Sequence, residues 1–67
     1  MNRAELGAAL RALRQASGKE AKAVARGAAM SGSKLSKIEN GSVMPGVVDV
    51  EQILTALAVL SREVVDG

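Results

Sequence analysis

The chain has 67 residues and a net charge of +2, so it forms at most one domain with a small core. It contains no Cys and no His, which excludes disulfides, thiolate or imidazole metal ligands, a thiol nucleophile and the usual general base. Phe, Trp and Tyr are absent too, so no aromatic ring can stack on unpaired bases. We therefore expect a protein that is not an enzyme and that uses no cofactor or metal.

The charges are divided unevenly along the chain. Residues 1–40 carry eight basic and three acidic side chains, a net of +5, whereas residues 41–67 carry one basic and four acidic side chains, a net of −3. A basic half of this kind suits a polyanion, although scattered charge on a small helical protein is an equally good explanation. The sequence has neither an apolar run of about 18 residues, as a membrane span needs, nor the apolar stretch of a signal peptide. A cytoplasmic protein that contacts no membrane is expected.

The first predicted helix spans residues 3–16, because Leu6, Leu10 and Leu13 recur at spacings of four and three along one face. Gly7 lies inside this helix, where glycine costs about 1 kcal/mol relative to alanine. Gly7 either permits a close contact between this helix and another, which is the preferred interpretation, or is simply tolerated.

A second helix is expected to begin at Ser17, which forms a capping box with Glu20 in the segment Ser-Gly-Lys-Glu. The helix runs through Val24 to Arg26 or Gly27, and its inward side consists almost wholly of small residues.

Ser31 is expected to cap a third helix, residues 32–40, whose only apolar positions are Leu35 and Ile38. These two anchors leave the remaining side chains of the helix free to face outward. Gly41 follows the helix and ends it, because glycine adopts the left-handed conformation without penalty. Two short helices separated by three or four residues, of which the second is capped and polar, have the layout of a helix-turn-helix.

A fourth helix is predicted over residues 47–58, after a short loop. Asp49 and Glu51 lie in its first turn, where the helix dipole favours negative charge, and this interpretation is preferred to a metal site. Ser61 is expected to cap a separate last turn, residues 62–66. The apolar residues expected on the inward side of the fourth helix are Val50, Ile53, Leu54 and Leu57.

Three blocks of residues make the chain resemble the Xre and lambda-repressor-like (Cro/C1-type) family of helix-turn-helix regulators. The first helix contains LRALR at residues 10–14, similar to an LR-x-LR run of the family, and SGSKLSKIENG at residues 31–41 closely matches its recognition segment. The third block is Pro45 followed by Ile53, Ala56, Leu57 and Val59, similar to the last core helix of the family. The alanine-rich composition and the phrase SKLSKIENG also resemble actinobacterial regulators.

The resemblance implies an all-α, compact lambda-repressor-like domain of four to five helices over residues 1–67, with helices 2 and 3 forming the helix-turn-helix. The third helix is then expected to enter the major groove of double-stranded DNA. Its base-facing candidates are Gly32, Ser33, Ser36 and Lys37. Of these, Lys37 is the strongest candidate, because a lysine reaches the O6 and N7 acceptors of guanine. The phosphate-binding candidates are Lys19, Lys22, Ser31, Lys34, Asn40 and Ser42.

The resemblance also implies a structural ion pair between Arg14 and Glu39, and it exposes two departures from the family. Ala21 stands where the family usually has a Gln that touches the DNA backbone, so the phosphate anchor of the second helix is altered. Ala29 stands at a turn position usually held by Gly, which predicts an altered turn or mild strain, part of which Gly27 can absorb.

The expected function is sequence-specific binding of double-stranded DNA by a bacterial transcriptional regulator, such as a repressor, acting as a homodimer at the nucleoid. A small repressor and the N-terminal head of a longer regulator with a C-terminal effector domain fit the sequence equally well. The alternative is a protein-interaction module of the antitoxin or bridging-factor type that keeps the fold with weak or no DNA binding. The apolar residues that exceed the needs of a small core, and that predict a dimer contact, are Val43, Val47, Val59, Leu60, Val64 and Val65.

Overall fold

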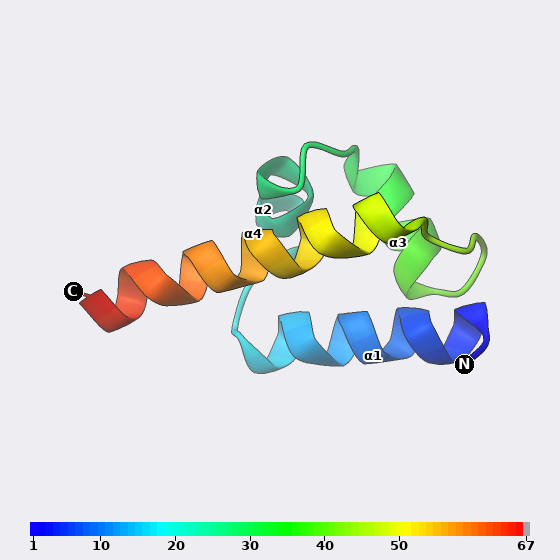
Figure 1. Ribbon diagram of the computed structural model, residues 1–67, viewed down its shortest axis with the longest axis horizontal. Helices are drawn as coiled ribbons and strands as arrows, with labels where there is room; N and C mark the ends of the chain where they lie inside the picture. The colour runs from blue at the N-terminus through cyan, green and yellow to red at the C-terminus, as the bar shows by residue number, and fades with distance from the viewer. Residues whose placement is uncertain (67) are drawn as a thin grey trace.

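The computed structural model describes the backbone of residues 1–66 and the side chains of residues 1–58. Every regular element in this part of the chain is an α-helix, and the two termini lie at opposite ends of the molecule (Figure 1). α1 packs on α3, and α2 packs on both α3 and α4. The four helices are α1 (Arg3–Ala16), α2 (Ala21–Gly27), α3 (Gly32–Glu39) and α4 (Val47–Asp66).

α1 has the bounds that its leucine spacing predicts. Asn2 caps the helix, since its side-chain oxygen accepts a hydrogen bond of 2.8 Å from the amide of Glu5. Leu10 is buried as expected, but Leu13 is 49% exposed. The buried stripe centres on Gly7, Leu10 and Arg14, and Leu13 lies about 100° from Arg14 around the helix, at the edge of that stripe. Leu13, which the spacing places on the same face as Leu6 and Leu10, is therefore not part of the core.

The segment after α1 ends that helix and does not start the next one, so the predicted capping box is wrong. The Ser17 hydroxyl donates 2.9 Å to the carbonyl oxygen of Leu13, and Gly18 has a φ of +69°. α2 begins four residues later at Ala21, after Glu20, whose side chain makes no capping hydrogen bond. Ser17 and Gly18 donate hydrogen bonds to the last carbonyl oxygens of α1, which would otherwise lack donors.

α1, α2 and α3 all end in the same hydrogen-bonded turn, in which the residue after the cap is left-handed. In each case its amide and the next one donate to carbonyls of the last turn, for example from Met30 to Ala25 at 3.0 Å in α2. The left-handed residue is Gly18 after α1 and Gly41 after α3, but it is Ala29 after α2, with a φ of +57°. The mild strain expected at Ala29 is therefore present. Gly27 remains helical and does not absorb it.

Replacing Ala29 by glycine is expected to stabilise the protein by about 1 kcal/mol, because it removes the Cβ penalty of the left-handed conformation. The matched control is Ala23→Gly in the exposed middle of α2, where the same change should destabilise by about 1 kcal/mol. Thermal unfolding followed by circular dichroism measures both, and the melting temperatures should move by several degrees in opposite directions. Equal losses in the two variants would show that Ala29 carries no strain.

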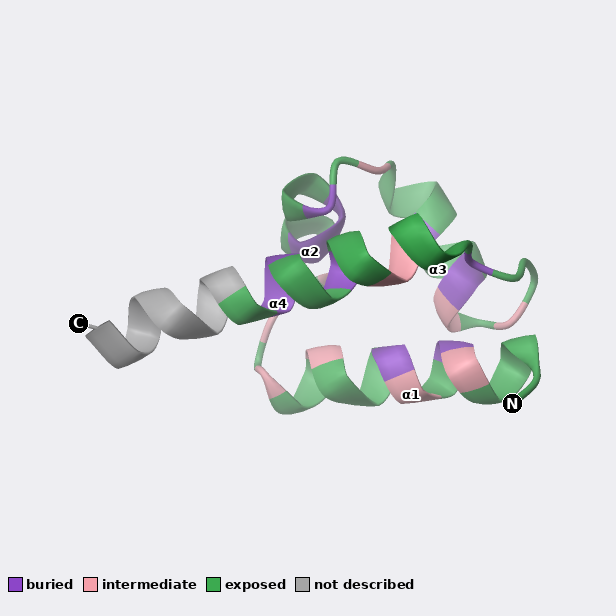
Figure 2. Ribbon diagram, viewed as in Figure 1, coloured by how far each residue is buried: buried purple, intermediate pink, exposed green. Residues whose placement is uncertain are grey.

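α3 and α4 supply most of the core. Leu35 and Ile38 of α3 are fully buried, and α4 adds Ile53, Ala56 and Leu57 at helical spacing (Figure 2). Leu54, expected inward, is 44% exposed because it lies about 100° around α4 from Ile53. α4 also continues through Ser61 to Asp66, so the predicted separate last turn is not formed. The buried hydrophobic residues are Leu10, Val24, Ala25, Ala28, Leu35, Ile38, Ile53, Ala56 and Leu57.

Candidate nucleic-acid interface

α3 presents one continuous polar face to solvent. Ser31 caps its first turn, since its hydroxyl accepts a hydrogen bond of 3.0 Å from the amide of Lys34. Leu35 and Ile38 fix the opposite side of the helix in the core, which leaves the outward side free of apolar side chains. The four residues predicted to face bases, Gly32, Ser33, Ser36 and Lys37, are all exposed.

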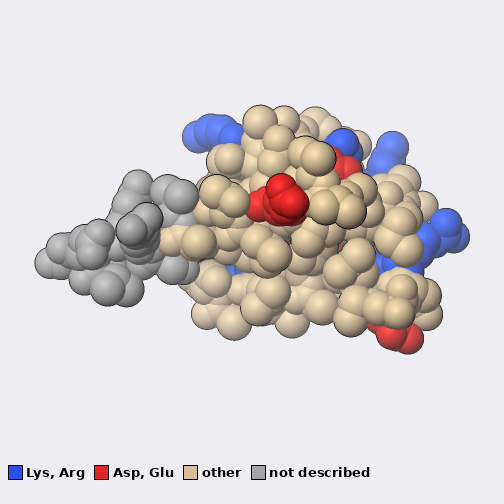
Figure 3. Space-filling view, in the orientation of Figure 1, with Lys and Arg blue, Asp and Glu red and all other residues tan. Residues whose placement is uncertain are grey.

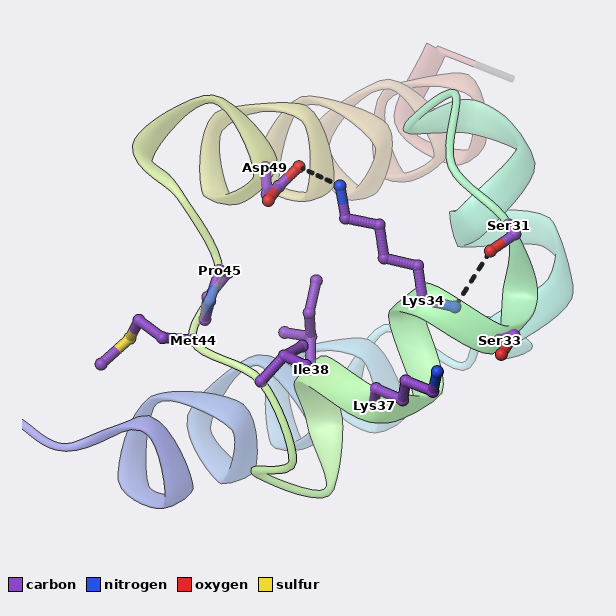
Figure 4. Close-up of a pocket in the computed structure, with 9 residues that line it drawn as sticks. Ser31, Ser33, Lys34, Lys37, Ile38, Met44, Pro45 and Asp49 are labelled. Carbon is purple, nitrogen blue, oxygen red and sulfur yellow. Dashed lines mark hydrogen bonds and ion pairs between the residues drawn. The ribbon is translucent and has the colours of Figure 1, made fainter.

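One flank of α3 is tied to α4 by an ion pair. The Lys34 ammonium lies 3.0 Å from Oδ1 of Asp49, and Oδ2 of Asp49 accepts a hydrogen bond of 3.1 Å from the amide of Gly46. Figure 4 shows the Lys34 side chain running across a hollow toward α4, while Lys37 stays on α3. The hydrogen bond from Lys34, helped by the Gly46 amide, holds the pKa of Asp49 below its ordinary value. Lys34, a predicted phosphate ligand, therefore already has an internal partner.

The opposite flank of α3 is tied to α1. The guanidinium of Arg14 donates to both carboxylate oxygens of Glu39, at 2.7 Å from Nε and 3.0 Å from Nη2. Its Nη1 donates 2.9 Å to the carbonyl oxygen of Lys19, so Arg14 also holds the turn before α2. The Glu39 hydrogen bond raises the pKa of Arg14 further above its already high ordinary value. The contacts of Arg14 therefore fix the position of α3 against α1.

The polar groups at the C-terminal end of α3 satisfy one another. The side-chain oxygen of Asn40 accepts hydrogen bonds from the Ser42 amide at 3.0 Å and from the Ser42 hydroxyl at 2.5 Å. Both residues are exposed, as is Lys22 on α2, whereas Lys19 is half-buried in the turn before α2. The predicted phosphate ligands thus lie at both ends of α3 and at the start of α2. Lysine and arginine atoms seen in Figure 3 lie at the rim of the molecule, toward α2 and α3.

α2 and α3 form a helix-turn-helix: a short turn joins them, α2 packs on α3, and the polar face of α3 is exposed. A family model described as a helix-turn-helix domain matches residues 5–66. The chain belongs to this helix-turn-helix family. Neither a curated protein nor a solved structure matches the chain. The all-helical arrangement and the family match agree with the lambda-repressor-like fold and the Xre-like resemblance, and they indicate DNA binding.

The helix-turn-helix domain contains one candidate contact that the sequence patterns did not single out. Arg11 of α1 lines a hollow of about 240 Å³ together with Ala21, with Ser36 of α3 and with Asn40, which follows α3. The hollow lies beside Ala21, the position at which the resembling family usually carries Gln. No spacing rule could place Arg11 next to Ser36, because the two residues are 25 positions apart and meet only through the packing of α1 on α3.

Metal-binding clusters and membrane-spanning helices are not found among the described residues of the helix-turn-helix domain. No three acidic side chains gather there in a cluster that could hold a metal ion. None of its helices combines the length and the apolar character needed to cross a membrane. The functional argument rests on the exposed polar face of α3.

Proposed function

We propose that this domain binds double-stranded DNA sequence-specifically as part of a bacterial transcriptional regulator, with α3 in the major groove. The observation that carries the proposal is the exposed polar face of α3, which is anchored in the core by Leu35 and Ile38 and tied to α1 by Arg14 and Glu39. A rigid helix of this kind can place side chains against base edges with little loss of conformational freedom. The repressor role and the nucleoid location belong to this proposal.

Lys37 is the proposed base reader, because its long side chain can donate to O6 and N7 of guanine. Gly32, Ser33 and Ser36 have short side chains or none, which favours close backbone approach, water-mediated contacts and recognition of DNA shape. The proposed phosphate ligands are the amides at the start of α3, Lys19, Lys22, Ser31, Asn40 and Ser42, with Arg11 added from the structure.

The domain is further proposed to act as a homodimer on a two-fold DNA site, with half-sites about one helical turn apart. Val43 and Val47, both expected at the dimer contact, are 36% and 76% exposed. The other four residues of that expected patch, Val59, Leu60, Val64 and Val65, lie outside the described side chains. Residues 1–67 are proposed to form one domain, either a small repressor or the DNA-binding head of a longer regulator with an effector domain.

A protein-interaction module remains the second candidate. Met44 and Val48 are 56% and 63% exposed, and Met44 lines a hollow together with Lys34 and Lys37 of α3, so apolar surface adjoins the polar face of this helix. Ala21 and Gly32 also remove side chains that a DNA-binding surface could use. DNA binding is distinguished from this candidate by its steep salt dependence, because neutralised phosphates release counterions.

Lys37→Ala is expected to relax the preference at one base pair, at a cost of about 1–3 kcal/mol for the preferred site. Lys22→Ala, the matched control on α2, should weaken binding to all duplexes about equally and make the salt dependence less steep. Selection from a random duplex pool at two salt concentrations, followed by titration of the enriched sites, measures both effects. Enriched sites with two-fold symmetry would support the dimer. A folded protein that enriches no sequence would contradict the proposed function and favour the interaction module.

A further inference from the structure

The Lys34–Asp49 ion pair restrains the one lysine on the flank of α3 that adjoins α4. Lys34 lies one helical turn before the buried Ile38 and next to the buried Leu35, so its exposed side chain lies at the edge of the buried face. Its side chain is 50% exposed and that of Asp49 is 22% exposed, so solvent and counterions reach both charges. The ammonium could reach either Asp49 or a phosphate beside α3, but a contact with one weakens its contact with the other.

Asp49 is fixed in place independently of Lys34. Its Oδ2 accepts from the Gly46 amide, and it lies in the first turn of α4, where the helix dipole stabilises a negative charge. An aspartate carboxylate is ionised at neutral pH, and the hydrogen bond from the Gly46 amide favours its ionised form without help from Lys34. The Asp49 carboxylate is therefore a charged acceptor that stays next to Lys34 in the free protein and in a DNA complex alike.

We propose that Asp49 competes with DNA phosphate for the Lys34 ammonium and so withholds one phosphate contact from the complex. This inference rests on the proposed function, since it assigns a positioning role to a residue that is not itself expected to contact DNA. Phosphate contacts carry no base information, so the competition lowers affinity for every duplex by a similar factor. Asp49 thereby limits unspecific binding without changing which sequence is preferred.

Asp49→Asn is the variant that tests the competition. Asparagine retains an oxygen that can accept from Gly46 but removes the charge that holds Lys34. At low salt, we expect affinity for random and selected duplexes to rise about fivefold, which is the upper range for an exposed ion pair. The logarithmic salt dependence should steepen by about one, because one additional phosphate is neutralised.

Glu51→Gln is the matched control, because it removes the same charge from the same helix two residues away. Glu51 lines a hollow with Gly27 and Ala29 at the end of α2, so it lies away from Lys34. Its loss should raise affinity much less and leave the salt slope near the wild-type value. Lys34→Ala provides the second control: adding Asp49→Asn to it should cause no further change beyond that of Glu51→Gln.

Fluorescence anisotropy with labelled duplexes over a range of salt concentrations measures all five proteins, after circular dichroism has shown equal helix content. Equal gains in Asp49→Asn and Glu51→Gln would overturn the inference, because only the net charge would then matter. A gain from Asp49→Asn that persists in the Lys34→Ala background would overturn it as well. If the folded wild-type protein and all variants bind no duplex, the proposed function itself fails. If the wild type binds DNA and Asp49→Asn binds it with the same affinity and salt dependence, only the inference fails.

Discussion

Replacing Gly7 by alanine is expected to destabilise the protein by about 3 kcal/mol, although alanine is the better helix former by about 1 kcal/mol. A Cβ at residue 7 would overlap the carbonyl oxygen of Ile38 and would lie 2.9 Å from that of Glu39. Both atoms belong to the backbone at the end of α3, so no rotamer change can relieve the clash. α1 and α3 would have to separate, which would disturb the Arg14–Glu39 contacts and the packing of Ile38.

The expected loss is large compared with the total stability of a domain this small, which is about 3–10 kcal/mol from the usual value per residue. Urea unfolding followed by far-UV circular dichroism measures the loss. The matched control is Gly32→Ala at the start of α3, where an added Cβ would meet no atom within 4 Å. That variant should be slightly more stable than the wild type, by about 0.5 kcal/mol. A Gly7→Ala protein as stable as Gly32→Ala would refute the close contact between α1 and α3.

The helix bounds that depend on local patterns were predictable from the sequence. The leucine spacing gave residues 3–16 for α1, and the Ser31 hydroxyl marks the start of α3, as its hydrogen bond to the Lys34 amide confirms. The close approach at Gly7 was also expected, because a glycine inside a helix needs a packing reason. These features depend on residues within one or two turns of each other, so sequence spacing contains the necessary information.

The predictions that were wrong concern residue types that occur in more than one structural context. Ser17 fits the start of a helix or the end of one, and the left-handed Gly18 decides for the end of α1. Ser61 was expected to start a new turn, but serine is also tolerated inside a helix such as α4. Leu13 and Leu54 match the apolar period, yet the core of this small domain covers only a narrow stripe of each helix. Which edge of that stripe is covered depends on tertiary packing.

The candidate site also has a part that the local sequence predicts and a part that depends on tertiary packing. The outward face of α3 follows from its own sequence, since Leu35 and Ile38 define the buried side. The Lys34–Asp49 contact joins residues 15 positions apart across the loop between α3 and α4, and no local pattern predicts it. Arg11 reaches the site only because α1 packs on α3. The residues that tune the proposed interface are therefore the ones that required a structure.

Glu39→Gln is expected to destabilise the protein by about 2 kcal/mol. The side chains of Arg14 and Glu39 are only 14% and 8% exposed, so the Arg14 charge would remain largely shielded from water with one acceptor replaced by an NH₂ group. Breaking a fully buried pair costs about 3–5 kcal/mol, and we expect less here because some solvent reaches both groups. Glu20→Gln is the matched control: this exposed side chain makes no capping bond, so its change should stay within about 0.5 kcal/mol.

A double-mutant cycle with Arg14→Met separates the ion pair from the rest of the contact. Methionine keeps much of the arginine stem, so Arg14→Met alone should cost about 2 kcal/mol by leaving the Glu39 carboxylate unpaired and by removing the donor to the Lys19 carbonyl. Once Arg14 is gone, the further change of Glu39 to Gln removes an unpaired charge, so the double variant should lose about 1–2 kcal/mol less than the sum of the single losses. Urea unfolding gives all three values. Strict additivity would mean that the 2.7 Å contact contributes nothing to holding α1 on α3, and that the apolar packing between the two helices alone fixes the presentation of the recognition helix.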